Sequence, residues 1–109
     1  YLFIQNINTD DKNLNFSKKF NSFYKQILQL DGKIIVYGNG TVGKTIQALI
    51  PSKIIGYVDI ADENNHPLNL KNMLYDKVLI SVLGREERIT RYLANELKID
   101  INKIITIDL

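Results

Sequence analysis

The sequence of 109 residues contains no cysteine, and it has only one histidine and two prolines. Without cysteine the chain cannot form disulfides or use a thiolate, which is compatible with a reducing compartment. His66 has no second histidine to complete a metal site, so we expect no bound metal. No apolar run approaches the ~18 residues of a membrane span, and no signal-peptide pattern opens the chain. We therefore expect a cytoplasmic protein without a membrane span.

The sequence also has no cluster of charges of one sign. The 14 basic and 12 acidic residues are scattered, and the net charge is only +2. Binding of nucleic acid or of a membrane surface by a basic patch is therefore not expected. Hydrophobic residues make up 45% of the chain, which is ordinary for one globular domain with a single core. Because the chain begins with Tyr1 and not with methionine, we expect further domains of a longer parent protein as its partners.

The first third of the chain predicts an amphipathic helix. Residues 1–7 are expected to be extended, residues 8–15 to form a polar loop, and Asn13 or Asn15 to cap the helix. The helix ends at Asp31-Gly32. Its apolar positions recur at helical spacing: Phe16, Phe20, Phe23, Tyr24 and Ile27. We expect this stripe to pack on the domain's own sheet, and a partner-binding helix is the alternative.

After this helix, strands and helices alternate. Apolar runs predict strands at residues 33–37, 53–59, 78–82 and 104–107. Helices are expected at residues 42–50, at residues 69–74 with Asn69 as the cap, and from Gly84 onward. This alternation predicts an α/β fold of the three-layer, Rossmann-like type, with a small, mostly parallel sheet of order 2-1-3-4. Residues 1–31 would form an N-terminal extension, and residues 32–109 the domain itself.

A glycine-rich turn follows the first predicted strand. Gly38, Gly40 and Gly43 stand at the spacing G-x-G-x-x-G, between a strand and a helix. In a dinucleotide-binding turn the first glycine permits the tight bend, the second admits the pyrophosphate, and the third lets the helix lie close to the strand. Backbone N–H groups of residues 39–42 would then hold the phosphates. These residues are Asn39, Gly40, Thr41 and Val42.

An acidic residue ends the second predicted strand at the distance that such a turn requires. Asp59 lies 21 residues after Gly38 and can accept hydrogen bonds from both ribose hydroxyls. No lysine or arginine follows closely to bind a 2′-phosphate, which would meet Asp59 and Asp62 instead. NAD is therefore favoured over NADP as the cofactor.

Two other types of loop fit part of the same segment. Gly38, followed after four residues by Gly43-Lys44-Thr45, also satisfies the P-loop of nucleoside triphosphatases. The extra glycine at position 40 and the lack of an acid at the end of the third strand count against it. A methyl-donor-type loop usually carries an acid before its first glycine, where this chain has Tyr37. The dinucleotide interpretation is favoured.

Five segments carry a resemblance to a known group of proteins: KIIVYGNGTVGKTI, KIIGYVDIAD, HPLNL, YDKVLIS and KIITIDL. From Lys33 onward the chain resembles small Rossmann-like nucleotide-binding domains attached to bacterial sugar-modifying and polysaccharide-biosynthesis proteins. These include nucleotide-sugar dehydratases, sugar acetyltransferases and glycan methyltransferases. The resemblance implies that NAD, another nucleotide or a nucleotide-sugar lies over the three glycines, with Asp59 near a ribose. In such dehydratases the catalytic residues lie in another domain, so the catalytic residues here are unknown.

The third strand should supply the other wall of the crevice. We expect Ser81 and Gly84 to line it, and Arg85 and Arg88 to be either phosphate ligands or solvated residues of the next helix. A degenerate scaffold that serves regulation or interaction is the alternative function from a different class. No nucleophile with an identifiable base is visible, so the chain is not expected to be catalytic on its own.

Overall fold

A parallel sheet of four strands forms the centre of the molecule. The computed structural model describes residues 10–107, with side chains from Lys18 onward, so the predicted extended segment 1–7 lies outside the described residues. The strands are β1 (Ile34–Tyr37), β2 (Ile54–Val58), β3 (Lys77–Ile80) and β4 (Ile104–Thr106). Their order is β2-β1-β3-β4, and all three pairings are parallel. The predicted α/β class and strand order are confirmed.

Two apolar layers cover the two faces of the sheet. Side chains alternate along β1, so Ile34 and Val36 face one side, while Ile35 and Tyr37 face the other. The first side packs against α1 (Asp10–Leu28) and α2 (Thr41–Leu49). The second side packs against η2 (Pro67–Asn72) and α3 (Glu86–Arg91), which continues as the π-helical segment η3 (Tyr92–Glu96). A short 3-10 turn, η4 (Ile101–Lys103), leads into β4.

Helix α1 is longer than the sequence predicts. It begins at Asp10, so the predicted loop at residues 8–15 is wrong for the part that the structure describes. Asn13 and Asn15 lie within the helix instead of capping it. Polar residues such as lysine and asparagine cost little at exposed helical positions, so polar composition alone does not mark a loop.

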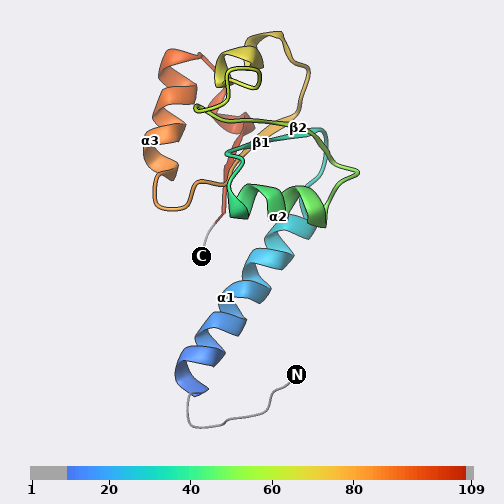
Figure 1. The fold of residues 1–109 in the computed structure, drawn as a ribbon, viewed down its shortest axis with the longest axis vertical. Coiled ribbons are helices and arrows are strands. Elements are labelled where there is room, and N and C mark those ends of the chain that lie inside the picture. The colour runs from blue at the N-terminus through green and yellow to red at the C-terminus, as the bar shows by residue number, and fades with distance from the viewer. Residues whose placement is uncertain (1–9, 108–109) are drawn as a thin grey trace.

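Only the C-terminal turns of α1 reach the sheet. Phe23 and Ile27 are buried, whereas Phe20 is 51% and Tyr24 39% exposed. The rings of Phe20 and Tyr24 stack at a centroid distance of 6.4 Å. A helix of this length measures about 28 Å, and α1 therefore extends well beyond the α/β part (Figure 1). The expectation that the aromatic stripe packs on the sheet is thus wrong for its exposed members, and the side chain of Phe16 lies outside the described residues.

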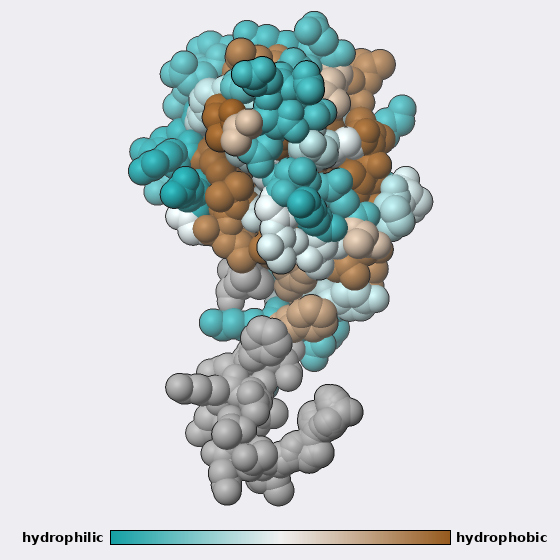
Figure 2. Space-filling model, in the orientation of Figure 1, coloured by the Kyte–Doolittle hydropathy of each residue, from teal (hydrophilic) through white to brown (hydrophobic). Residues whose placement is uncertain are grey.

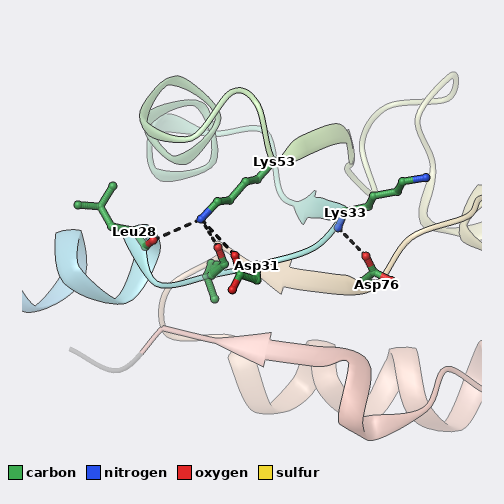
Figure 3. A network of polar contacts seen from close by, with 6 residues as sticks. Leu28, Asp31, Lys33, Lys53 and Asp76 are labelled. Carbon is green, nitrogen blue, oxygen red and sulfur yellow. Dashed lines mark hydrogen bonds and ion pairs between the residues drawn. The ribbon is translucent and has the colours of Figure 1, made fainter.

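A lysine of the second strand region holds the end of α1 (Figure 3). The Lys53 ammonium donates to the carbonyl oxygens of Leu28, at 3.4 Å, and of Leu30, and it lies 3.7 Å from the Asp31 carboxylate. The helix ends at Leu28, before the predicted Asp31-Gly32 stop. Gly32 follows with a φ of +89°. Beyond it, the backbone N–H of Lys33 donates to the Asp76 carboxylate at 2.7 Å.

Two boundaries near the carboxyl ends of the strands differ from the sequence prediction. The helical segment η2 is capped by His66, whose Nδ1 accepts from the N–H of Leu68 at 3.2 Å, while Asn69 lies inside the segment. A proline at the next position, with its fixed φ, favours this earlier start. The helix after β3 begins at Glu86, because Gly84 belongs to the turn before it.

Polar residues cover much of the face drawn in Figure 2, and hydrophobic residues gather in separate patches between them. Among residues 10–107, no helix has both the length and the hydropathy that crossing a membrane requires.

Candidate functional site

The chain passes from β1 to α2 through only three residues, Gly38, Asn39 and Gly40. Gly38 has a φ of +104°, in the region that favours glycine. A Cβ at this position would also lie 2.8 Å from the Ser81 hydroxyl and 2.8 Å from a methyl group of Val82. The tight turn therefore requires glycine at position 38, as the sequence predicts.

The other two glycines of the loop differ in their surroundings. Gly43 is buried in the first turn of α2, and a Cβ there would collide with the carbonyl oxygen of Gly38. It lets the helix lie close to the strand. Gly40 has a φ of −83°, and a Cβ there would meet no atom within 4 Å. Neither backbone conformation nor packing within the described residues requires glycine at position 40.

Unpaired N–H groups surround this open position. The N–H groups of Gly40, Thr41, Val42 and Gly43 have no hydrogen-bond partner within residues 10–107, and the first bond of the helix runs from Lys44 to the oxygen of Gly40 at 2.9 Å. No side chain caps α2, and its first turn contains no acidic residue. Within the described residues, the N–H groups at the positive end of the helix dipole are thus left without an acceptor. Such an end is suited to binding an anion.

Asp59 follows β2 and contacts the glycine loop directly. Its Oδ2 accepts a hydrogen bond from the N–H of Asn39 at 2.8 Å, and its Oδ1 accepts from the N–H of Ala61 at 2.9 Å. The sequence interpretation assigned the N–H of Asn39 to a phosphate, but in this structure the Asp59 carboxylate holds it. A carboxylate offers about four lone-pair sites, so Asp59 retains capacity to accept further hydrogen bonds.

A second acidic residue stiffens the segment after β2. The Asp62 carboxylate accepts hydrogen bonds from the Tyr57 hydroxyl at 2.8 Å and from the Asn65 side chain at 3.2 Å. These bonds, the one from Tyr57 first, lower the pKa of Asp62. The N–H of Asp59 itself donates to the carbonyl oxygen of Asn65 at 2.8 Å. The tip that carries Asp59 is therefore fixed by local hydrogen bonds.

Ser81 acts on the glycine loop from the neighbouring strand. It is 5% exposed, and its hydroxyl lies 2.8 Å from the carbonyl oxygen of Tyr37 and 3.1 Å from that of Gly38. Because a hydroxyl has one proton, it donates to one of these oxygens at a time. Its N–H also donates to the oxygen of Tyr37. The structure therefore places Ser81 beneath the loop, where its hydrogen bonds hold the backbone.

Gly84 shapes the turn that leads into α3. It has a φ of +87°, and the N–H of Arg85 donates to the oxygen of Val82 at 3.3 Å. A positive φ at the third position of such a four-residue turn is the type II arrangement, which requires glycine. Gly84 thus turns the chain from the end of β3 into α3.

A cavity of about 340 Å³ lies between the tip of β2 and the start of α3. It is lined by Tyr37, Gly38, Asp59, Ile60, Val82, Arg85, Arg88, Ile89 and Tyr92. Burial raises the pKa of Tyr37, and the nearby charges of Tyr92 and Asp59 raise this pKa further. Asp59 and Gly38 connect the cavity to the glycine loop. The sequence predicts the two arginines as either phosphate ligands or solvated residues, but no sequence pattern assigns a ligand contact to Tyr37, Ile60, Ile89 or Tyr92.

The glycine loop is too short for a P-loop, because α2 already begins at Thr41, before Gly43-Lys44-Thr45. Lys44 and Thr45 lie in the first turns of α2, and the Thr45 hydroxyl donates to the oxygen of Thr41 at 2.8 Å. Only three residues connect β1 to α2, and this connection is too short to wrap around a phosphate as a P-loop does. This geometry favours the dinucleotide interpretation over the P-loop.

Comparisons with protein-family models, with curated proteins and with solved structures find no match to this chain. The geometry of the glycine loop and of the cavity is therefore the basis for the function proposed below.

Proposed function

We propose that the chain is a nucleotide-binding domain whose ligand carries a diphosphate, with NAD or a nucleotide-sugar as the ligand type. One observation supports this above others: open space at Gly40 adjoins four N–H groups that have no partner within residues 10–107. Gly40 is the N-cap of α2, where glycine is favourable but is not required by backbone conformation or packing, and it would let a phosphate approach the backbone closely.

The phosphate oxygens would accept from the N–H groups of residues 40–43 and lie at the positive end of α2. A ribose hydroxyl would donate to the remaining lone pairs of Asp59. The segment after β2 is acidic, with Asp62 and Glu63 following Asp59. A 2′-phosphate would be repelled there, so NAD is favoured over NADP.

Binding is the task that we assign to this domain. Group or hydride transfer would need residues of another domain of the parent protein. The bacterial sugar- and polysaccharide-processing context and the cytoplasmic location belong to the same proposal, and they come from the sequence alone.

The test is a thermal-shift panel of NAD, NADP, ADP, UDP-sugars and Mg-ATP. Ligand at ~100 times its dissociation constant should add ~2.7 kcal/mol of apparent stability. Stabilisation by NAD or a UDP-sugar that does not require magnesium supports the proposal. Magnesium-dependent stabilisation by ATP that is lost in Lys44→Ala would instead identify a P-loop. If no ligand of the panel stabilises the protein, the result would favour a regulatory or interaction scaffold.

A further inference from the structure

Tyr37, the last residue of β1, is a buried residue whose hydroxyl has no hydrogen-bond partner among the described residues. The residue is 6% exposed, and its hydroxyl makes no hydrogen bond within residues 10–107. Two other hydroxyls of the region are paired, since the Ser81 hydroxyl donates to the backbone and the Tyr57 hydroxyl donates to Asp62. A buried polar group without a partner is unusual in folded proteins and calls for an explanation.

The phenol group faces the cavity at the end of the sheet. Tyr37 lines this cavity together with Asp59 and Tyr92. Burial first, and then the charges of the same two residues, raise the pKa of Tyr37. The cavity of about 340 Å³ is at the lower end of the range of about 300–1,000 Å³ for small-molecule sites. It has room for one ring system and not for a whole dinucleotide.

The residues that line the cavity define the chemistry of a ligand that fits it. Ile60, Val82 and Ile89 give apolar walls that suit the faces of a planar ring. Arg85 and Arg88 stand at the same cavity without an ion-pair partner in the described part of the chain. A guanidinium only donates hydrogen bonds, so the edge of the ring must offer acceptors.

The order of groups along the site matches the order of groups in a nucleotide. The unpaired N–H groups at Gly40 suit the phosphates, Asp59 suits the ribose, and the cavity begins at Asp59. We propose that Tyr37 is a specificity-determining residue whose hydroxyl hydrogen-bonds the edge of the ligand's heterocyclic base, with the two arginines as further donors. This inference rests on the proposed nucleotide binding.

The test compares ligands with and without a base on the whole chain. Isothermal titration calorimetry with ADP, GDP and UDP is set beside titration with pyrophosphate, which lacks both base and ribose. In Tyr37→Phe, we expect the dissociation constant of the preferred nucleotide to rise roughly threefold to tenfold. The dissociation constant of pyrophosphate should not change. The melting temperature of the free protein should be unchanged or higher, because the hydroxyl that is removed has no partner.

Tyr75→Phe is the matched control. Tyr75 is half-buried against the same apolar layer, under the ammonium of Lys103, and does not line the cavity. This variant should bind all four ligands as the wild type does. A second measurement needs no variant: the ring resonances of Tyr37 should shift on addition of the preferred nucleotide and stay in place with pyrophosphate.

Each other outcome overturns the inference in a recognisable way. Equal nucleotide affinity of wild type and Tyr37→Phe would exclude a base contact and leave nucleotide binding intact. Equal weakening of nucleotide and pyrophosphate would mean that Tyr37 acts through the glycine loop. A lower melting temperature of free Tyr37→Phe would reveal an internal role for the hydroxyl. Absence of nucleotide binding by the wild type would overturn both proposals.

Discussion

The backbone N–H of Asn39 donates a hydrogen bond to the carboxylate of Asp59 at 2.8 Å. This bond joins the glycine loop after β1 to the tip of β2, and the parallel register that pairs Tyr37 with Val58 brings the two segments together. Asp59 therefore shapes the loop before any ligand arrives. A substitution of Asp59 changes both the loop and the expected ribose contact, and experiments must separate the two effects.

Asp59→Ala removes the acceptor for two N–H groups, those of Asn39 and Ala61. We expect the free energy of unfolding to fall by about 1–3 kcal/mol, measured by urea denaturation without ligand. Asp59→Asn keeps one acceptor oxygen, so it should lose less stability and still lose part of its nucleotide affinity. If Asp59→Ala unfolds like the wild type, the bond to Asn39 does not support the loop.

Gly40 and Gly43 offer a matched pair of substitutions by alanine. Gly43→Ala places a methyl group against the carbonyl oxygen of Gly38. We expect a loss of about 1–3 kcal/mol in unfolding free energy from this overpacking. Gly40→Ala meets no atom within 4 Å and places alanine at the N-cap of α2, so the unfolding free energy should fall by less than about 1 kcal/mol.

The two variants separate the structural from the ligand-binding role of the loop. Under the proposed function, Gly40→Ala should bind NAD or a UDP-sugar much more weakly than the wild type, while its unfolding free energy falls by less than about 1 kcal/mol. Calorimetric titration next to urea denaturation measures both quantities. Nucleotide affinity that survives Gly40→Ala would place the diphosphate away from this position.

The strand order and the roles of Gly38 and Gly43 could be predicted from the sequence. Apolar runs that alternate with helical segments allow few topologies, because crossovers between parallel strands are right-handed. The spacing of the glycines predicts where the chain turns and where the following helix packs closely against the strand. These are local signals, and each can be recognised within a short stretch of chain.

The contacts that join distant segments could not be predicted in this way. The bond between Asn39 and Asp59 depends on the register of two strands, and the cavity around Tyr37 depends on how α3 packs. The exposure of Phe20 has a similar origin. Its helical spacing is correct, but the sheet is too small to cover a helix that is 19 residues long.

The hydrogen bond between Tyr57 and Asp62 should make stability depend on pH. This bond, together with those from Asn65, lowers the pKa of Asp62 below its ordinary value of 3.8. A lowered pKa in the folded state stabilises the protein above pH 3.8, and this contribution is lost as the pH falls through the folded-state pKa. The bond to Asp62 also raises the pKa of Tyr57 above 10.0, so the contribution from Tyr57 is lost at high pH.

Tyr57→Phe tests this pH dependence. The variant should be less stable than the wild type in urea denaturation at neutral pH, and the difference should shrink as Asp62 becomes protonated. Asp62→Asn should remove most of the same pH dependence while keeping a similar side-chain shape. The hydrogen bond would not be the source of the pH dependence if the difference in unfolding free energy between wild type and Tyr57→Phe stayed constant until Asp62 is fully protonated.

Lys53 links the segment before β2 to the C-terminal end of α1. Its ammonium reaches two carbonyl oxygens at the end of the helix, and its side chain is only 30% exposed. Lys53→Met keeps much of the aliphatic stem and removes the donors. We expect a loss of about 1–2 kcal/mol in unfolding free energy. We also expect amide hydrogen exchange in the last turns of α1 to be faster in Lys53→Met than in the wild type, while exchange in the sheet stays the same. The reason is that Lys53 no longer contacts the carbonyl oxygens at the end of the helix.

The control for Lys53→Met is Asp31→Asn, which removes the exposed ion pair and leaves the carbonyl contacts. Asp31 is 97% exposed at its side chain, and exposed ion pairs contribute about 0–1 kcal/mol. Asp31→Asn should therefore resemble the wild type in both measurements. If the two variants behave alike, the carbonyl contacts of Lys53 do not hold α1. The helix would then be positioned by the burial of Phe23 and Ile27 alone, and Ile27→Ala would be the substitution that releases it.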